Sequence, residues 1–373
     1  MQLKGKEESN NMVDRILAIN PGATSTKIGY FENDKLQWKK ELSYSYEKVS
    51  EYQKIMDQYE FRYQDIAQCL KTKNFSAASF DSVVGRGGLL PPVNAGAYLV
   101  NDAIMDCLKN RPVLEHASNL GASLAKGISK EFGTSECEAF IYDPVTVDQM
   151  EEVARISGLA LIERKSIGHV LNMRAVCMKI AEDKLEKPYE ESNFVVAHVG
   201  GGSSASAHKQ GRMIDLISDD EGLFSAERTG GLPLKEVIPL CYNYSEKEMT
   251  DLTRKKGGLV SYFGTNDARL IEEKAQKGDE KAKIVLEAMA YQIAKTIGEL
   301  ATVLYGKIDA VILTGGLAHS VHITELVKER TSFLAPVYIV PGEEELTALA
   351  KGARRVLIGQ EKANIFQEPA YNN

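Results

Sequence analysis

One pattern of strands and turns occurs twice in this chain, and this internal repeat constrains the fold more than any other feature. The segment ILAINPGATSTKIGYFENDKL, which begins at Ile16, is echoed by VVAHVGGGSSASAHKQGRMI, which begins at Val195. With Asn20 placed on His198, the copies align without gaps at an offset of 178 residues. Each copy reads as an apolar strand, a turn rich in Gly, Ser and Thr, a second strand, a polar turn and a third strand. Two such hairpins about half a chain apart predict a duplicated domain.

Short apolar runs alternate with helical stretches along the rest of the sequence, which is typical of α/β proteins. Further strands are expected at 82–86, 139–142, 308–313 and 337–340. Helices are expected at 47–71, 100–110, 118–130, 165–184, 234–241, 246–255, 267–276, 279–305 and 344–358. Together with the repeat, this predicts two domains, each a five-stranded mixed sheet flanked by helices.

Length and composition exclude several classes of protein. A chain of 373 residues favours two domains. Lys plus Arg number 45 against 52 Asp plus Glu, and a net charge of −7 disfavours non-specific binding to nucleic acid or to an anionic membrane. No apolar run approaches the ~20 residues of a membrane helix, and the N-terminal segment lacks the apolar stretch of a signal peptide. The five cysteines are scattered and contain no CxxC pair, which excludes a disulfide framework and a cysteine zinc site. This pattern fits a protein of the reducing cytoplasm.

Three Gly-rich turns, at residues 20–27, 198–204 and 314–318, each follow an apolar strand. Glycine lets backbone N–H groups approach a phosphate closely, and Ser and Thr add hydroxyl donors. One such turn alone is most simply a tight turn. Three of them, two in duplicated register, favour phosphate binding, although none is the GxxxxGK[ST] loop of P-loop proteins.

A dinucleotide-binding site is a competing interpretation of the second turn, because Gly200, Gly202 and Ala205 spell GxGxxA. That fingerprint requires a helix to open at the turn. The residues that follow, SASAHKQGRMIDLI, contain a polar turn at Gln210-Gly211 and favour a hairpin. The hairpin interpretation is therefore preferred over an oxidoreductase.

Charged residues stand where strands are expected to end, which is where α/β sheets carry functional side chains. Arg86, Asp143 and His198 each end an expected strand. Arg228 lies beside two glycines, where a surface salt bridge is an equally good explanation. His116 and His169, each at the start of an expected helix, are of a kind that is more often structural than catalytic.

With these residues in view, the sequence resembles the acetate kinase and butyrate kinase family, which has the fold of actin and hexokinase, over residues 15–359. The resemblance rests on ordered motifs: INPGATSTK, VVGRGG, EHASNLG, YDPVT, RKSIGHVLN, HVGGGSS, AERTGG, TNDAR, TGGLA and PGEEELTALA. It implies duplicated actin-like (ribonuclease H-like) domains with a nucleotide cleft between them. The first domain would comprise 1–148 plus 343–373, on the acid and phosphate side, and the second 149–342, on the nucleotide side.

The resemblance also implies reversible transfer of the γ-phosphoryl group of ATP to the carboxylate of butyrate or a similar short-chain fatty acid, with Mg²⁺ accompanying the nucleotide. The implied catalytic residues are Arg86, Arg228, His169, Asp143 and His116. The implied phosphate- and nucleotide-binding residues are Asn20, Ser25, Thr26, His198, Gly200, Gly201, Gly202, Ser203, Asp267, Arg269, Gly315 and Gly316. Asp143 with Glu344 or Glu345 would hold the metal. A homodimer or larger homo-oligomer is also implied.

The sequence departs from acetate kinases around the implied acid site. Glycines at 87, 88 and 168 replace bulkier side chains of acetate kinases, and Gly201 replaces an Asn. We expect Gly87, Gly88 and Gly168 to leave room for a longer acyl chain, since each buried methylene contributes ~0.8 kcal/mol. Discrimination per methylene is limited to ~10–200-fold. A branched-chain or propionate kinase therefore stays open, as does a non-catalytic actin-like nucleotide-binding module.

Overall fold

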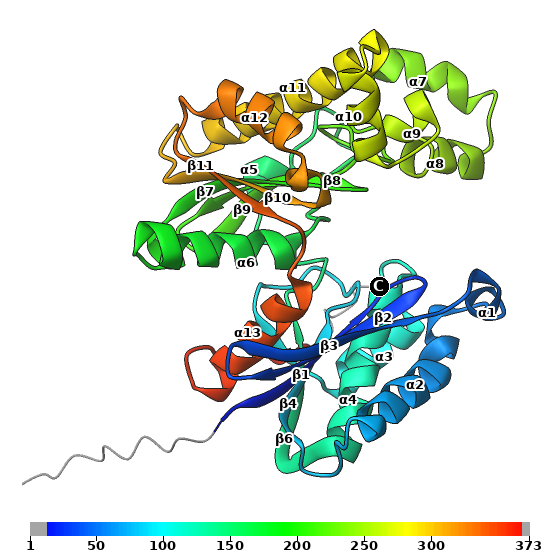
Figure 1. Ribbon diagram of the computed structural model, residues 1–373, viewed down its shortest axis with the longest axis vertical. Helices are drawn as coiled ribbons and strands as arrows, with labels where there is room; N and C mark the ends of the chain where they lie inside the picture. Colours follow the sequence, from blue (N-terminus) through cyan, green and yellow to red (C-terminus); the bar gives the residue numbers. More distant parts are fainter. Residues whose placement is uncertain (1–12, 368–373) are drawn as a thin grey trace, which may run out of the picture. The chain divides into compact units, whose positions relative to one another are not determined.

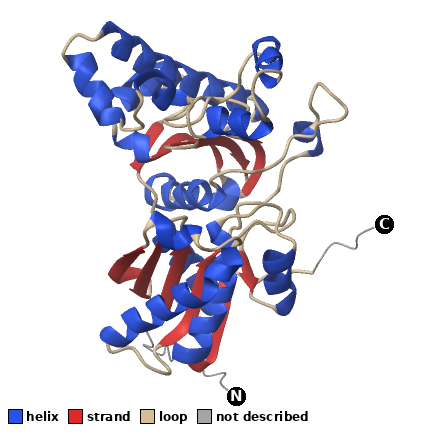
Figure 2. Cartoon of the chain, turned by 90° about the vertical axis from the view of Figure 1, so that its right-hand side faces the viewer, coloured by secondary structure: helices blue, strands red, loops and turns tan. Residues whose placement is uncertain are grey.

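Strands and helices alternate along the chain, as Figures 1 and 2 show. The computed structural model describes residues 13–367. Packing divides the chain into two units. The first comprises the described residues up to Pro91, then Gly96–Asp143 and the described residues from Leu346 onward, and the second comprises Pro92–Ala95 and Pro144–Glu345. Residues 1–12 and 368–373, which the expected first domain includes, lie outside the described residues.

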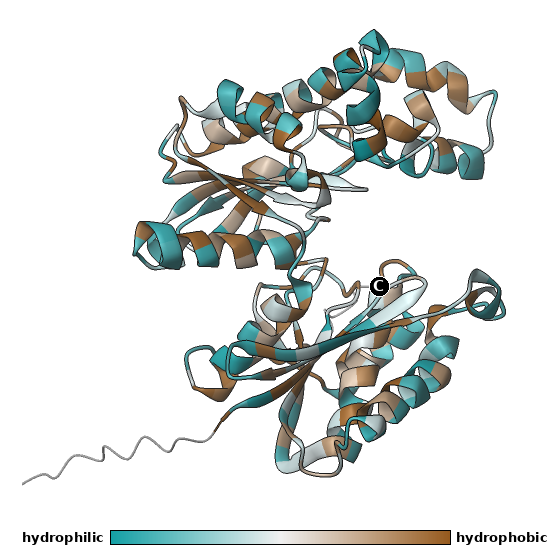
Figure 3. Ribbon diagram, viewed as in Figure 1, coloured by the Kyte–Doolittle hydropathy of each residue, from teal (hydrophilic) through white to brown (hydrophobic). Residues whose placement is uncertain are grey.

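The sheet of the first unit has six strands in the order β3-β2-β1-β4-β6-β5. They are β1 (Arg15–Pro21), β2 (Ser25–Glu32), β3 (Lys35–Ser43), β4 (Phe80–Arg86), β5 (Ala97–Leu99) and β6 (Gly133–Tyr142). β1, β4 and β6 are parallel, whereas β2, β3 and β5 each run antiparallel to a neighbour. The expected count of five was wrong for this sheet, because β5 is only three residues long and gives no periodic signal. The edge strand β3 is mostly exposed and hydrophilic (Figure 3).

The helices of the first unit are α1 (Tyr46–Ser50), the 3₁₀ turn η1 (Ile55–Gln58), α2 (Tyr59–Thr72), α3 (Asp102–Asn110), the 3₁₀ turn η2 (Ala117–Asn119), α4 (Leu120–Phe132) and α13 (Glu345–Leu357). The single helix expected over 47–71 is interrupted after α1. Ser45 caps α1 by accepting a hydrogen bond from the Lys48 N–H (3.2 Å), and the chain turns before η1 leads into α2. α13 packs closely on β6, since a Cβ at Gly352 would lie 2.4 Å from the Tyr142 ring.

The second unit is built on a five-stranded mixed sheet, in the order β11-β10-β7-β8-β9. Its strands are β7 (Asn193–Val199), β8 (Ser203–Lys209), β9 (Arg212–Ile217), β10 (Ala310–Gly315) and β11 (Val337–Pro341). β7, β10 and β11 are parallel, and β7, β8 and β9 form an antiparallel meander. The long helix α11 (Glu280–Val303) covers one face of the sheet and α6 (Val170–Ile180) covers the other (Figure 1).

The remaining elements of this unit are helices and short helical turns. They are α5 (Glu152–Arg155), the π turn η3 (Ala181–Leu185), the 3₁₀ turns η4 (Tyr189–Glu191) and η5 (Gly316–His319), α7 (Leu234–Cys241), α8 (Glu246–Arg254), α9 (Gly258–Phe263), α10 (Ala268–Gln276) and α12 (Val321–Thr331). The helix expected over 165–184 begins only at Val170 and becomes a π turn at Ala181. No helix within residues 13–367 is both long and apolar enough to cross a membrane.

The two hairpins match, but their second strands differ in register by one residue. Pro21 pairs with Thr26, five positions later, whereas Val199 pairs with Ser203, four positions later. The second turn is therefore one residue shorter, and the ungapped offset of 178 holds for β1 and β7 but not for β2 and β8. Because strand side chains alternate between faces, a shift of one residue would place the wrong side chains in the core.

Candidate active site

Three parallel strands of the first unit end side by side, and each has a polar residue at or next to its last position. β4 and β6 remain paired as far as Arg86 and Tyr142, and β1 ends beside β4. Asn20, Arg86 and Asp143 thus lie on neighbouring strands at one edge of the sheet. Arg86 Nη1 lies 3.5 Å from Asn20 Oδ1. The structure brings these predicted site residues together.

Asp143 is held rigidly in an unusual backbone conformation. Its φ of +39° is rarely adopted by residues other than glycine and costs on the order of 1–3 kcal/mol. The carboxylate is buried, and Oδ1 accepts a hydrogen bond from the Gly96 N–H (2.7 Å). Strain of this kind is concentrated at functional sites, where it fixes the direction of a side chain.

The predicted metal ligands are all carboxylates, which are donors that magnesium prefers. Glu344 is exposed, and Glu345 opens α13. Within residues 13–367, no group of three or more His, Cys, Asp or Glu side chains is placed to hold a metal ion. Magnesium commonly keeps several waters and is bound through one or two carboxylates plus substrate phosphates. The donor set fits an ion that arrives with nucleotide phosphates rather than one held in a cage of side chains.

The turn of the first hairpin, residues 22–25, is held from one side by Arg62. Arg62 Nη1 donates to the carbonyl oxygens of Gly22 (2.8 Å) and Ser25 (3.0 Å), and Nη2 donates to that of Ala23 (2.9 Å). Ser25 is half-buried at the end of the turn. Sequence reasoning missed Arg62, which lies inside a helix without any motif around it.

Thr26 lies differently from expectation. Its side chain is fully buried, and its hydroxyl oxygen accepts hydrogen bonds from Arg62 Nη1 (3.1 Å) and the Tyr44 hydroxyl (3.2 Å). This contradicts the expectation that the Thr26 hydroxyl would face a phosphate. The hydroxyl instead belongs to the support of the turn.

The second Gly-rich turn, residues 200–202, is held from behind by the segment 225–227. The N–H groups of Ala226 and Glu227 donate to the carbonyl oxygens of Gly200 (3.2 Å) and Gly201 (3.1 Å). The Ser225 hydroxyl also donates to the Gly201 carbonyl (2.5 Å). The strand β8 follows the turn directly, so the helix that a dinucleotide fingerprint requires is absent there.

Arg228 lies directly against this turn. A Cβ at Gly202 would lie 2.4 Å from Arg228 Nη1, so the guanidinium can occupy this place only beside glycine. Arg228 also forms an ion pair with Asp219, whose carboxylate accepts a further hydrogen bond from Arg254 Nη2 (3.1 Å). Burial lowers the pKa of Arg228, and the nearby positive charge of Arg254 lowers it further. An arginine nevertheless keeps its proton, so the site holds a fixed positive charge.

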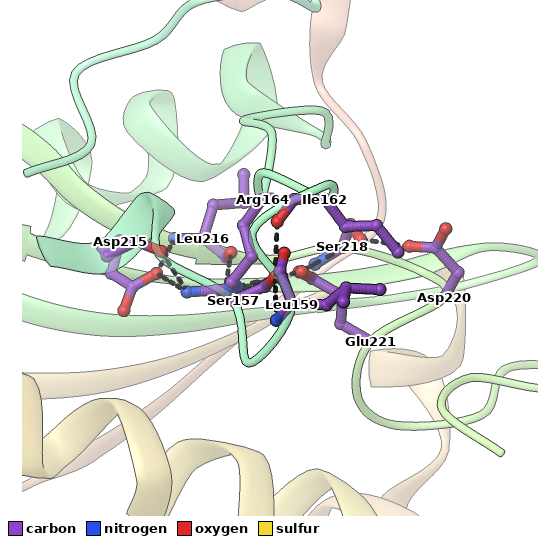
Figure 4. Close-up of polar contacts among 10 residues, drawn as sticks. Ser157, Leu159, Ile162, Arg164, Asp215, Leu216, Ser218, Asp220 and Glu221 are labelled. Atoms are coloured by element: carbon purple, nitrogen blue, oxygen red, sulfur yellow. Dashed lines mark hydrogen bonds and ion pairs between the residues drawn. The ribbon is translucent and has the colours of Figure 1, made fainter. Parts of the chain in front are cut away.

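The loop that carries Asp219 is anchored by the polar cluster in Figure 4. Arg164 Nη1 donates to Asp215 Oδ1 (3.1 Å), and Arg164 Nε donates to Glu221 Oε1 (2.9 Å). Glu221 Oε2 in turn accepts a hydrogen bond from the Ser218 N–H (3.0 Å). These contacts connect β9 to the loop on which Asp219 lies.

His198, at the end of β7, is the centre of a polar network. Asn172 Nδ2 donates to His198 Nδ1 (3.0 Å) and to Thr314 Oγ1 (3.0 Å), and the Thr314 hydroxyl donates to the Gly342 carbonyl (3.2 Å). Because Nδ1 accepts, this network assigns the ring proton to Nε2. His198 Nε2 lies 2.9 Å from Glu343 Oε1, without the alignment of a hydrogen bond. The carboxylate beside His198 is thus the first of the three consecutive glutamates.

His169 lies on top of His198 at the start of α6. The two ring centroids are 3.8 Å apart and the ring planes differ by 2°. His169 Nδ1 lies 2.9 Å from Ser204 Oγ, and Ser203 Oγ accepts a hydrogen bond from the Gly200 N–H (3.3 Å). His169 is therefore adjacent to the second turn. Asn172 and Glu343 lie within the motifs RKSIGHVLN and PGEEELTALA, but the sequence analysis did not single out either of them as a site residue.

A cavity of about 740 Å³ opens beside the second turn, within the size range of small-molecule sites. Its walls include the predicted residues Gly200, Gly201, Asp267, Arg269 and Gly316. They also include Glu227, Asn266, Glu272 and Ser320, which were not predicted. Gly315 directly precedes Gly316 and has a φ of +92°. A Cβ at Gly315 would lie 2.3 Å from the Val199 carbonyl oxygen. The glycines thus allow two turns to meet closely.

His116 has a local structural role in the first unit. Its ring Nδ1 accepts a hydrogen bond from the Ser118 N–H (3.2 Å) and so caps η2. His116 as a whole is exposed. The catalytic role that the family resemblance implies for His116 stays a prediction.

The glycines expected to enlarge the acyl pocket lie in close packing. Gly87 is buried. A Cβ at Gly88 would lie 2.7 Å from both Asn119 Oδ1 and a Leu108 methyl group. At Gly168 it would lie 2.8 Å from a Leu216 methyl group. The expectation of free space next to Gly88 and Gly168 was therefore wrong, since neighbouring side chains already fill it.

The arrangement of both sheets matches that of known carboxylate kinases. An acetate kinase from Porphyromonas gingivalis superposes with a TM-score of 0.72 at 19% identity, covering 92% of this chain and 100% of that structure. A propionate kinase from Francisella tularensis gives a TM-score of 0.65 at 18% identity, covering 91% and 98%. At these identities the likeness establishes the fold, an α/β fold of two mixed sheets flanked by helices.

Sequence comparison then gives the family. The acetokinase family matches residues 169–366. Butyrate kinase 2 of Clostridium acetobutylicum is 46% identical over 357 residues, which cover 95% of this chain and 99% of that protein. The chain belongs to the acetokinase family.

Proposed function

We propose that this protein is an ATP-dependent kinase of butyrate or a similar short-chain fatty acid, forming the acyl phosphate and ADP reversibly. The observation that carries the proposal is the 46% identity, over nearly the full length of both chains, to a relative named butyrate kinase 2. The arginines beside the sheet edge and the Gly-rich turn support it, because they supply the charge that the reaction needs.

The chemistry requires positive charge rather than a general base. A carboxylic acid with a pKa of ~4–5 is already an anion at neutral pH. The difficulty lies in bringing this anion to a polyanion and in holding the transferred group in line. Arg86 and Arg228 suit this task, because guanidinium groups stay charged and bind oxygen atoms bidentately. We assign them to the carboxylate and to the equatorial phosphoryl oxygens.

The other site residues complete this assignment. His169, oriented by Ser204 and by the ring of His198, would donate a hydrogen bond to the phosphoryl oxygens. Asn20, Ser25 and the 200–203 turn would hold phosphates through N–H groups and side-chain donors. Magnesium bound with the nucleotide would neutralise phosphate charge, held by Asp143 and by Glu344 or Glu345 directly or through water. Catalysis would then consist of positioning and electrostatic stabilisation.

The cavity of the second unit is assigned to the nucleoside part of ATP. It is lined by the segment 266–269 and by Gly316, next to the turn assigned to the phosphates. Polar groups such as Asn266, whose Nδ2 donates to Glu227 Oε1 (2.7 Å), are available to select a nucleoside.

Two further assignments concern the cell and the assembly. The five cysteines are all free thiols, which fits a cytoplasmic location. We infer a homodimer or larger homo-oligomer, as the family resemblance implies. Large apolar side chains exposed on α7, at Leu234 and Ile238, are candidates for such a contact. Sedimentation velocity at several protein concentrations would measure the state.

A hydroxamate assay with MgATP tests the function. Hydroxylamine converts an acyl phosphate into a hydroxamate, and the panel comprises acetate, propionate, butyrate, isobutyrate, valerate and isovalerate. Turnover that peaks with butyrate supports the proposal. A peak with a branched acid or propionate would keep the mechanism and change the substrate.

Two outcomes would contradict the proposal more deeply. Turnover that peaks with acetate would remove the assignment to a longer acid. Tight ATP binding without turnover of any acid would instead indicate a non-catalytic actin-like nucleotide-binding module. The Arg228→Ala variant is the background control for all six acids.

A further inference from the structure

Arg62 is the most deeply buried charged group of the first unit, and the contacts of its guanidinium are unusual. All three of its nitrogen atoms donate hydrogen bonds. Nε and Nη2 donate to Gln58 Oε1 (3.1 and 2.7 Å), and the other partners are three carbonyl oxygens of the 22–25 turn and the Thr26 hydroxyl. The aromatic ring of Tyr44 lies over the guanidinium, 4.7 Å from Cζ to the ring centroid.

Every one of these partners is electrically neutral. No carboxylate forms an ion pair with Arg62 in the part of the chain that the structure describes. Burial lowers the pKa of Arg62, but arginine keeps its proton in proteins. A buried charge without a counter-charge is expensive, so its presence calls for an explanation beyond packing.

Support of the turn alone does not require this charge, as the second hairpin demonstrates. There the carbonyl oxygens of Gly200 and Gly201 are bound from behind by backbone N–H groups and the Ser225 hydroxyl, all of them neutral. The carbonyl oxygens of the two turns are thus held by different kinds of hydrogen-bond donor. Among the described residues of the two turns, only the carbonyl groups of the first turn accept hydrogen bonds from a buried cation.

The orientation of the turn shows where the charge acts. In a trans peptide the C=O of one residue points opposite to the N–H of the next. Because the carbonyls of Gly22 and Ala23 point to Arg62, the N–H groups of Ala23 and Thr24 point away from it. Neither N–H donates to any protein group within residues 13–367, and both residues are exposed. Consecutive N–H groups with this orientation form an anion-binding concavity.

We propose that Arg62 is a positioning residue for a phosphate-binding site at the 22–25 turn, and that its uncompensated charge favours the phosphoryl anion bound on the opposite side of the turn. The negative charge of the bound anion would compensate the positive charge of Arg62. Its identification as the phosphoryl group of the acyl phosphate rests on the proposed function. The binding of a phosphate anion at the Ala23 and Thr24 amides does not.

Inorganic phosphate is the direct probe, applied to the full chain labelled with ¹⁵N. In the wild-type protein, the amide resonances of Ala23 and Thr24 should shift on titration with phosphate. Arg62→Gln, which removes the charge, should weaken phosphate binding about tenfold or more. Arg62→Lys, which keeps the charge but not the planar fork, should recover part of that loss. Arg354→Gln, which removes an ion-paired arginine of the same unit, is the matched control and should bind phosphate as the wild type does.

Kinetics and stability separate this role from mere support. Arg62→Gln should lower kcat/KM for the acyl phosphate about tenfold or more. Arg62→Lys should lose less activity than Arg62→Gln, although the two variants should have similar melting temperatures. If folded Arg62→Gln binds phosphate and turns over like the wild type, the proposal is overturned and Arg62 is only a brace. If Arg62→Gln does not fold, unshifted Ala23 and Thr24 amides in the wild type would overturn it equally. If the wild-type protein turns over none of the acids, the proposed function is contradicted, but the proposed role of Arg62 in phosphate binding is not.

Discussion

His169 and His198 stack face to face, with centroids 3.8 Å apart and planes that differ by 2°. His198 is buried, Asn172 donates a hydrogen bond to its Nδ1, and a Glu343 carboxylate oxygen lies 2.9 Å from its Nε2. The ring of His198 therefore acts as a rigid platform for His169. The direction in which His169 presents its outer nitrogen depends on residues that do not themselves contact a phosphoryl group.

Loss of the Asn172 amide should loosen this platform. Asn172→Ala removes the hydrogen bonds to His198 and Thr314, and a misplaced His169 should lower kcat about 10- to 100-fold with little change in ATP affinity. Steady-state kinetics and ATP titration measure the two effects. Asn243→Ala, at an exposed amide after α7, should leave both unchanged. An unaltered kcat in Asn172→Ala would show that the stack does not direct His169.

Removal of the Arg228 side chain should abolish most turnover. We expect Arg228→Ala to reduce kcat by about 10²- to 10³-fold, because the charge that faces the transferred group is lost. ATP should bind nearly as well, since the nucleoside cavity is lined by other residues. Isothermal titration with ATP and the hydroxamate assay measure the two effects. Normal turnover in this variant would remove Arg228 from the mechanism.

The contact between Gly202 and Arg228 can be tested from the turn. In Gly202→Ala the new methyl group would lie 2.4 Å from Nη1, so the guanidinium must move. We expect kcat to fall about tenfold or more. Gly201→Ala is the steric comparison, because its nearest neighbours are 3.6 Å away, and it should lose less activity. Equal losses in the two variants would mean that the position of Arg228 is not the cause.

Gly88→Ala distinguishes close packing from an open acyl pocket. The added Cβ would overlap Asn119 and Leu108, so the free energy of unfolding should fall by about 1–3 kcal/mol. Urea denaturation measures this change. Gly158→Ala, where no atom lies within 4 Å, should change it by less than about 0.5 kcal/mol. A stable Gly88→Ala protein with a preference for shorter acids would restore the pocket explanation.

His208 should make the protein sensitive to acid. Burial, together with the smaller effect of the nearby positive charge of Arg174, lowers its pKa from 6.5 to about 3. Between these values the unfolded chain binds a proton that the folded chain does not, so unfolding becomes easier as the pH falls below 6.5. The loss is about 1.4 kcal/mol per pH unit within that range.

The matched variant for this prediction is His208→Gln, which keeps hydrogen-bonding capacity toward Tyr189 and Ser206 without titrating. Urea unfolding at a series of pH values should give a shallower dependence for His208→Gln. His322→Gln, at an exposed histidine, should keep the wild-type dependence. Identical slopes in all three proteins would show that His208 is not responsible.

Periodicity and turn residues predicted most of the fold. The two hairpins, α7, α8, α10 and α11 lie within two residues or so of the ranges that the sequence predicted. The omissions have local causes. β5 is too short to show alternation, and α9 begins at Gly258 with a φ of +53°, which no helix propensity would suggest. The one-residue register difference between the hairpins depends on turn geometry, which similar sequences do not reveal.

Of the candidate site, the sequence predicted only residues that stand in recognisable motifs. Arg228 and the Gly-rich turns stand in recognisable patterns, whereas the roles of Arg62 and Asn172 depend on contacts with residues far from them in the chain. Glycine proved the least reliable guide. At Gly88 the sequence pointed to space, but a missing side chain serves equally well to let other groups come close.

The membership of α13 in the first unit has a consequence for synthesis on the ribosome. Asp143 and Leu346 belong to the same unit but lie 203 positions apart (346 − 143). At ~5–20 residues per second, the ribosome needs about 10–40 s to make the intervening chain. Until then Tyr142 and the surface that Leu349 and Ala353 will cover remain open to water. The nascent chain must therefore carry an unfinished hydrophobic surface through most of its translation, as a natural substrate for molecular chaperones.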